Sequence, residues 1–118
     1  MTAVLVPPPP AGVRGRFLKF TRVDGDYATV AVAALLGCEA GACKHIAVAL
    51  GAVAPRPVRD RDAEKALIGR PPTDQAIAVL GETLAAACDP VDDVRGSAAY
   101  RRALVPILVG RAIKSLMQ

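Results

Sequence analysis

Four chemically capable side chains lie within six residues near the start of the chain: Arg22, Asp24, Asp26 and Tyr27. Gly25, between the two carboxylates, supplies the positive φ that a tight turn requires. A capped hairpin turn is the simplest interpretation. Such a turn does not need a guanidinium, two carboxylates and a phenol at this density, so the segment is the first candidate for a site that faces a ligand or a partner.

A second cluster offers possible metal ligands, with Cys38, Cys43 and His45 in the spacing C-x4-C-x-H. This spacing fits no familiar zinc or iron–sulfur pattern, and a fourth ligand would have to be Cys88 or an acidic residue. Cysteines at strand ends are more often small apolar residues. We therefore expect no metal here. We also expect no catalytic triad around His45, because neither a nucleophile nor an orienting acid is marked for it.

The sequence contains no glycine-rich loop of the dinucleotide or Walker type that would bind nucleotide phosphates. Its 15 basic and 11 acidic residues give a net charge of +4, but the basic residues are spread along the chain. With two Phe, two Tyr and no Trp, the chain offers few rings for stacking on bases. We therefore expect no nucleic-acid partner.

The 118 residues suffice for one domain with one core. The hydrophobic fraction is 53%, mostly aliphatic, which suggests that a partner covers some of the apolar surface. An odd count of three cysteines without a signal peptide indicates a reducing cytoplasm. No apolar stretch is long enough to predict a membrane span.

Residues 1–15 are predicted to be an extended, proline-rich lead-in, and residues 16–118 a single folded domain. Four consecutive prolines favour polyproline geometry in the lead-in. From Arg16, the segment RFLKFTR alternates in the manner of a strand, and YATVAVAALL and HIAVALGAV are apolar and β-branched enough for buried strands. The short loops between them predict an antiparallel meander of three to four strands.

Three helices are expected after the strands. The predicted segments are 60–69, 74–89 and 97–116. Thr73 or Asp74 caps the second helix and Ser97 opens the third. Gly81 permits close packing on the apolar face of the second helix. The predicted fold class is therefore α+β, a two-layer sandwich in which strands and helices are segregated.

The last helix is apolar on two sides. One stripe contains Tyr100, Leu104, Ile107 and Leu108, and the other contains Val105, Val109, Ala112, Ile113 and Leu116. A helix that is apolar almost all round is buried on more than one side. We expect one stripe to meet the sheet or a neighbouring helix, and the stripe with Val109 and Ile113 to form an interface with a partner. Pro106 should kink or locally break the helix.

The segment DDVRGSAAYRR, residues 92–102, has the character of a helix entrance. The basic residues with which Asp92 and Asp93 could pair are Arg95, Arg101 and Arg102. Gly96 turns the chain, and Ser97 caps the helix. By its chemistry alone, this segment is interpreted as a solvated and well-capped start of a helix.

The order of these segments resembles the C-terminal domain of the flavin subunit of molybdenum hydroxylases, the family of aerobic carbon monoxide dehydrogenases and xanthine dehydrogenase relatives. The resemblance covers residues 4–116 and is most specific in the R…GDYA turn, in ALGAVAPRP and in D-x-RGSAAYRR. It implies an α+β sandwich of three or four strands and three helices. It also implies that an FAD-binding portion, with glycine-rich loops for the pyrophosphate, precedes this domain in complete subunits.

In that family, the turn that matches residues 22–27 lies beside the isoalloxazine ring of the flavin. The resemblance therefore implies that Tyr27 packs near the ring. It implies that Arg22, Asp24 and Asp26 set the local field and shape the access of the electron acceptor. Val23 stands where many relatives carry a second basic residue, so the sequence does not indicate which acceptor is used.

The first functional hypothesis is a component of a molybdenum-containing hydroxylase or dehydrogenase. The chain would complete the flavin subunit, which passes electrons from iron–sulfur clusters through FAD to an acceptor. The FAD would be shared with a partner domain or subunit, and the molybdenum cofactor and iron–sulfur clusters would belong to partner subunits. In this family the substrate chemistry belongs to the molybdenum subunit, so the sequence does not indicate the substrate.

The alternative hypothesis is a repurposed stand-alone domain without flavin. It would act as a homodimeric scaffold or a small-ligand-binding protein. The surplus apolar face of helix 97–116 would then be buried against a second copy.

Overall fold

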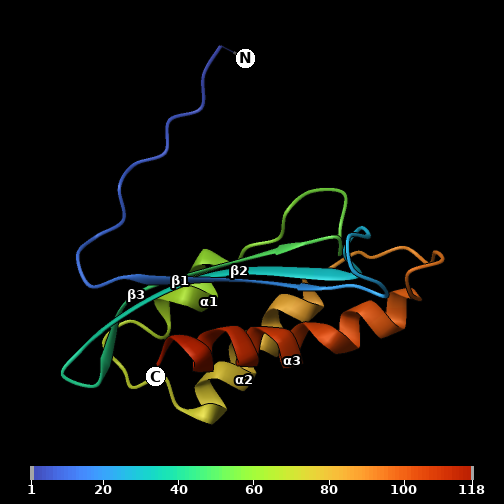
Figure 1. The fold of residues 1–118 in the computed structure, drawn as a ribbon. Helices are drawn as coiled ribbons and strands as arrows, with labels where there is room; N and C mark the ends of the chain where they lie inside the picture. Colours follow the sequence, from blue (N-terminus) through green and yellow to red (C-terminus); the bar gives the residue numbers. More distant parts are fainter. Residues whose placement is uncertain (1, 118) are drawn as a thin grey trace.

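A computed structural model describes residues 2–117 as three antiparallel strands followed by three helices. The strands are β1 (Arg14–Phe20), β2 (Val30–Glu39) and β3 (Ala42–Gly51), paired in the order β1-β2-β3. The helices are α1 (Arg61–Lys65), α2 (Asp74–Ala86) and α3 (Ala98–Leu116). Helices α2 and α3 lie on one side of the sheet, α1 lies beside β3, and the lead-in leaves β1 on the other side (Figure 1). The predicted α+β meander with segregated layers is confirmed.

Each helix begins directly after a residue that caps its N-terminus. Asp60, Thr73 and Ser97 each accept a hydrogen bond from a backbone N–H in the first turn of α1, α2 and α3, respectively. The first helix is shorter than predicted, because α-helical geometry ends at Lys65 and turns lead on to Gly69 at φ 81°. None of the helices within residues 2–117 is long and apolar enough to cross a membrane.

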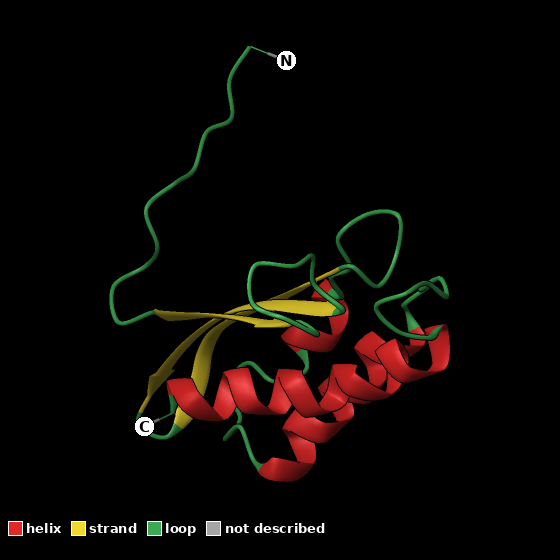
Figure 2. Cartoon of the chain, turned by 45° about the vertical axis from the view of Figure 1, so that its right-hand side comes forward, coloured by secondary structure: helices red, strands yellow, loops and turns green. Residues whose placement is uncertain are grey.

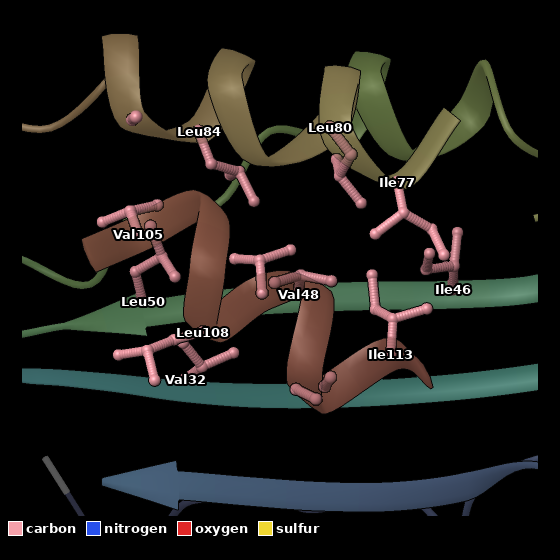
Figure 3. Close-up of a cluster of buried hydrophobic side chains, with 14 of the residues drawn as sticks. Val32, Ile46, Val48, Leu50, Ile77, Leu80, Leu84, Val105, Leu108 and Ile113 are labelled. Atoms are coloured by element: carbon pink, nitrogen blue, oxygen red, sulfur yellow. The ribbon is translucent and has the colours of Figure 1, made fainter. Parts of the chain in front are cut away.

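The core lies between the sheet and the pair α2 and α3. Figure 3 shows side chains of β2 and β3 pointing toward residues of both helices. The predicted apolar face of the second helix is confirmed by the burial of Ile77, Leu80 and Leu84 on α2 and of Cys88 just after its end. On β2, alternate residues from Val30 to Leu36 are buried, as a strand with one covered face requires.

Helix α3 corrects two predictions. The local break expected at Pro106 is absent, because the helix continues from Ala98 to Leu116, whereas the alternative expectation of a kink stays a prediction. A Cβ on Gly81 would lie 2.9 Å from the Cα of Pro106, so α2 and α3 cross at this point with almost no space between their backbones. We attribute the continuity of α3 to this packing, which holds the helix where the proline removes one backbone hydrogen bond.

The second correction concerns the stripe that was expected to be an interface. Val105, Val109, Ala112 and Ile113 are all fully buried, so this stripe belongs to the core. Because α3 lies between α2 and the sheet, it needs two apolar sides within its own domain. The exposed large apolar residues of α3 are instead Tyr100 and Ile107, on its other side, at 46% and 52% exposure.

One uncovered apolar surface among residues 2–117 is the face of the sheet away from the helices. We call it the outer sheet face, and it consists of Phe17, Ala33, Leu35, Ala47 and Ala49. Phe17 is 63% exposed and Leu35 37% exposed. No helix packs on this face within residues 2–117, as Figure 2 also shows.

The free edge of β3 is closed by the segments that follow it. Leu50 exchanges two backbone hydrogen bonds with Val58. The N–H of Val48 donates to the carboxylate of Glu64 at 3.1 Å, and Arg59 holds that carboxylate from the other side at 2.8 Å. This edge is therefore unavailable for pairing with another chain.

Candidate functional site

The candidate turn is built by two local hydrogen bonds. The N–H of Asp26 donates to the carbonyl of Val23 at 3.3 Å, and Gly25 between them has φ 82°. The N–H of Tyr27 then donates to Oδ1 of Asp26 at 2.7 Å. The turn closes where the N–H of Thr29 donates to the carbonyl of Phe20 at 2.8 Å. This geometry leaves the Tyr27 side chain 77% exposed.

A loop from the far end of the chain meets this turn. Both Nε and Nη2 of Arg95 donate to Oδ1 of Asp26 at 3.3 Å. The guanidinium carbon of Arg95 lies 5.0 Å from the centroid of the Tyr27 ring, within cation–π range. The turn and the loop before α3 lie side by side at one end of the sheet (Figure 1). One arginine therefore holds both the carboxylate and the aromatic ring of the turn.

The charge environment keeps Asp26 ionised. The hydrogen bond from the Tyr27 N–H is the main cause that lowers the pKa of Asp26, against a smaller opposing effect of desolvation. The side chain of Arg95 and the nearby charge of Arg22 lower it further. The site therefore presents a stable carboxylate beside an exposed aromatic ring.

Arg95 is itself positioned by Asp93. Oδ1 of Asp93 accepts from the N–H of Arg95 at 2.8 Å and from Nη2 of Arg101 at 2.6 Å. These bonds lower the pKa of Asp93, the one from the Arg95 N–H most. The carbonyl of Arg95 accepts from the buried hydroxyl of Thr29 at 2.9 Å. The loop is thus tied to the turn through the backbone of Arg95 as well as through its side chain.

Arg101 links a third segment to the same place. Its side chain is 4% exposed, and Nη1 donates to the carbonyl of Ala52 at 2.6 Å. Ala52 has φ 68°, an unfavourable conformation for a residue with a Cβ. The hydrogen bond from Arg101 helps to hold Ala52 in this conformation. The segments quoted as most specific in the sequence, around residues 22–27, 49–57 and 93–102, therefore converge in the structure.

The structure brings together only part of the predicted set. Asp26 and Tyr27 are joined by Arg95, and Arg22 contributes its charge from an exposed position. Asp24 is exposed at the tip of the turn. Arg95 was missed as a site residue, because sequence proximity suggested pairing with Asp92 or Asp93. Of the basic residues in that segment, it is Arg101 whose side chain pairs with Asp93.

The cysteine and histidine cluster does not form a metal site among residues 2–117, where no three such ligands gather. Cys43 is buried and Cys38 is exposed at the end of the sheet. His45 pairs with Gly37 across the strands, one pair before the two cysteines.

Comparison with known proteins shows to which family the domain belongs. Residues 16–116 match the model of the CO dehydrogenase flavoprotein C-terminal domain. The chain belongs to this family. The match extends over nearly the whole domain in both sequence and structure.

Two curated relatives illustrate the family. The carbon monoxide dehydrogenase medium chain of Afipia carboxidovorans is 36% identical over 118 aligned positions, covering 97% of this chain. The glyceraldehyde dehydrogenase medium chain of Sulfolobus acidocaldarius is 30% identical and covers 89% of this chain. The chain spans 40% and 37% of the length of these two relatives.

A solved relative has the same fold. The carbon monoxide dehydrogenase of Hydrogenophaga pseudoflava, in a form that lacks the Mo-pyranopterin moiety of its molybdenum cofactor, superposes with a TM-score of 0.89 at 35% identity. The match covers 95% of this chain and 39% of that one.

The residues of this flavoprotein domain fit one side of a flavin site. Pyrophosphate binding needs several backbone N–H groups that converge in a glycine-rich loop. Gly25, Gly41 and Gly69 have positive φ but stand singly at separate turns. The turn does offer an exposed aromatic ring with a carboxylate and a guanidinium beside it. Such groups can cover a ring system and tune its potential.

Proposed function

We propose that this domain completes the flavin site of a molybdenum-containing hydroxylase or dehydrogenase. Arg22, Asp24, Asp26 and Tyr27 face the isoalloxazine ring of an FAD whose pyrophosphate is bound by a partner domain or subunit. Bound FAD supplies the redox chemistry, accepting electrons from iron–sulfur clusters and passing them to an acceptor. This chain supplies the aromatic cover and the local charge.

The observation that carries this proposal is the cluster of Asp26, Tyr27 and Arg95. A tyrosine that is 77% exposed yet held in place by a cation on its ring is suited to lie against a partner's ligand. A paired carboxylate beside it contributes a fixed negative charge, which opposes the build-up of electrons on a nearby flavin. Arg95 joins the four predicted residues in this proposal as the residue that positions two of them.

The outer sheet face is proposed as the docking surface for the flavin-binding portion. The matched family model is a C-terminal domain, and this chain covers only 40% of the Afipia carboxidovorans relative, so most of that subunit precedes the matched part. The lead-in leaves β1 on the side of the outer sheet face (Figures 1 and 2). A portion joined through the lead-in would therefore meet this face first.

The proposed assembly includes an iron–sulfur subunit and a molybdenum subunit as further partners. The medium-chain names of the relatives support this, because a medium chain is one of several chains. We further infer a cytoplasmic location, for which the three free thiols are the supporting feature. The alternative hypothesis, a stand-alone homodimer, required an exposed second stripe on α3. The stripe with Val109 and Ile113 is buried in the core, so nothing supports this alternative.

The test is a pair of half-reactions in the assembled enzyme. Tyr27→Ala should change the rate of flavin reoxidation by the acceptor and leave reduction of the molybdenum centre by substrate nearly unchanged. Rapid-mixing absorption spectra separate the two. Val79→Ala, an exposed residue on α2, is the control and should change neither. Equal damage to both half-reactions by Tyr27→Ala, or damage to neither, would contradict the position proposed for the turn.

A further inference from the structure

Strand pairing brings two cysteines together at the β2–β3 hairpin. Cys38 and Cys43 are direct cross-strand partners, next to a shift in register after Gly37. The N–H of Cys43 donates to the carbonyl of Arg70 at 2.8 Å, and its carbonyl accepts from the N–H of Gly69 at 2.7 Å. Both backbone groups of Cys43 are therefore turned away from β2. Cys38 and Cys43 form a pair without backbone hydrogen bonds between them.

This type of pair has the geometry that a disulfide needs. In antiparallel sheets, the Cα atoms of such pairs are about 4.5 Å apart, closer than in hydrogen-bonded pairs. Disulfides require Cα separations of about 4.4–6.8 Å. Residues directly opposite each other also project from the same face of the sheet. The two thiols, both free in this structure, can therefore be joined without rearranging the strands.

The two cysteines differ in accessibility. Cys43 is fully buried, and its Sγ donates a weak hydrogen bond to the carbonyl of His45 at 3.7 Å. Burial is the main cause that raises the pKa of the Cys43 thiol, and the neighbouring Cys38 adds to it. Cys38 is exposed and lines a cavity of about 310 Å³ that Arg14 and Leu116 also line. A small oxidant therefore reaches Cys38 first.

We propose that Cys38 and Cys43 are a reversible oxidation site that forms a cross-strand disulfide with glutathione disulfide, or a similar small disulfide, as the oxidant. The Cys38 thiolate attacks one sulfur of the oxidant and displaces one glutathione thiolate, which leaves a mixed disulfide on Cys38. The Cys43 thiolate then attacks the Cys38 sulfur and releases the second glutathione. Two electrons reduce the oxidant, and the two protons from the cysteines end on the two glutathione thiols.

The disulfide would fix one end of the sheet. It closes the tip of the hairpin, residues 38–43, while Cys43 stays bonded to the 69–70 segment before α2. The third thiol offers no competing partner. Cys88 is buried just after the C-terminus of α2, and its Sγ donates to the carbonyl of Leu84 at 3.2 Å. The structure therefore assigns the oxidation to one pair among the three cysteines.

The experiment incubates the purified chain with glutathione disulfide and counts free thiols after denaturation. The count should fall from three to one. Trypsin cleaves after Arg22 and Lys44, so both cysteines lie in one peptide, residues 23–44. That peptide should become lighter by two hydrogens and return to its original mass with a thiol reductant. Cys88→Ser should form the same disulfide.

Two variants distinguish the steps. Cys43→Ser should accumulate a glutathione adduct on Cys38, because the resolving thiol is gone. Cys38→Ser should leave the other two thiols unmodified in the folded chain. The proposal is overturned if the unaltered chain stops at the adduct on Cys38, if Cys88 enters the disulfide, or if all three thiols persist. None of these outcomes depends on the proposed flavin function, which this experiment leaves untouched.

Discussion

Arg95 and Asp26 are 69 residues apart in the sequence, and their side chains form an ion pair at 3.3 Å that fixes the candidate turn. The same guanidinium lies over the ring of Tyr27. The position of the exposed ring therefore depends on a loop that is contributed by the entrance of α3. Perturbing Arg95 should perturb the turn without touching the turn itself.

The ion pair predicts a pH dependence of stability. The pKa of Asp26 is lowered in the folded chain from 3.8, so its contribution is present above that value and is lost as pH falls through the lower folded pKa. Asp26→Asn should reduce the free energy of unfolding at neutral pH. The difference from the unaltered chain should shrink as pH falls below about 4. Urea unfolding across this range measures it, and Asp24→Asn, on the exposed tip, is the matched control.

The isolated chain should bind FAD weakly. Contacts to the ring from one turn are too few to offset the cost of ordering a large hydrated dinucleotide. Titration calorimetry with FAD should show no binding tighter than about micromolar, or roughly −8 kcal/mol. Co-expression with the flavin-binding portion should give a yellow complex. Tight stoichiometric binding to the chain alone would indicate a self-sufficient flavoprotein instead.

The outer sheet face should control assembly. Phe17→Asp places a charge on the proposed docking surface, where it would be desolvated by a partner. It should abolish co-purification with the flavin-binding portion and leave the thermal stability of the isolated domain nearly unchanged, since Phe17 is 63% exposed. Val79→Asp, at 59% exposure on α2, is the matched control and should still co-purify. The reverse pattern would place the docking surface on the helices.

The crossing of α2 and α3 gives two glycine substitutions opposite expected signs. A Cβ at Gly81 would lie 2.9 Å from the Pro106 backbone, so Gly81→Ala should destabilise the domain by about 1–3 kcal/mol. A Cβ at Gly110 would meet nothing within 4 Å, so Gly110→Ala should stabilise α3 by about 0.5–1 kcal/mol. Urea unfolding of both variants tests the packing. Two changes of the same sign would contradict it.

The buried stripe of α3 is tested by a pair of isoleucines on one helix. Ile113 is fully buried in the core, so Ile113→Ala should cost about 2–5 kcal/mol. Ile107 is 52% exposed, and Ile107→Ala should cost less than about 0.5 kcal/mol. Chemical denaturation measures both. Comparable costs would indicate that the stripe with Ile113 is not core.

The sequence by itself determined the local features of this protein. Alternation in RFLKFTR, the β-branched strands, and the caps at Thr73 and Ser97 depend on neighbouring residues, and each was found where it was expected. The motifs also carried the resemblance to the family, and they include the turn with Asp26 and Tyr27. Both ends of the strands, and the ends of α1 and α2, moved by a few residues from the expected bounds, because pairing and packing decide where an element begins and stops.

The tertiary structure decided what each apolar face and each charge meets. Periodicity showed that α3 has two apolar sides, but only the packing of α2 and the sheet against α3 placed Val109 in the core. The tertiary structure also showed that the outer sheet face is left uncovered. Local spacing likewise suggested Asp92 or Asp93 as the partner of Arg95, whereas the fold brings Asp26 to it from the other end of the chain. Ion pairs and core contacts form between residues close in space, and a pattern of neighbours along the chain does not contain that information.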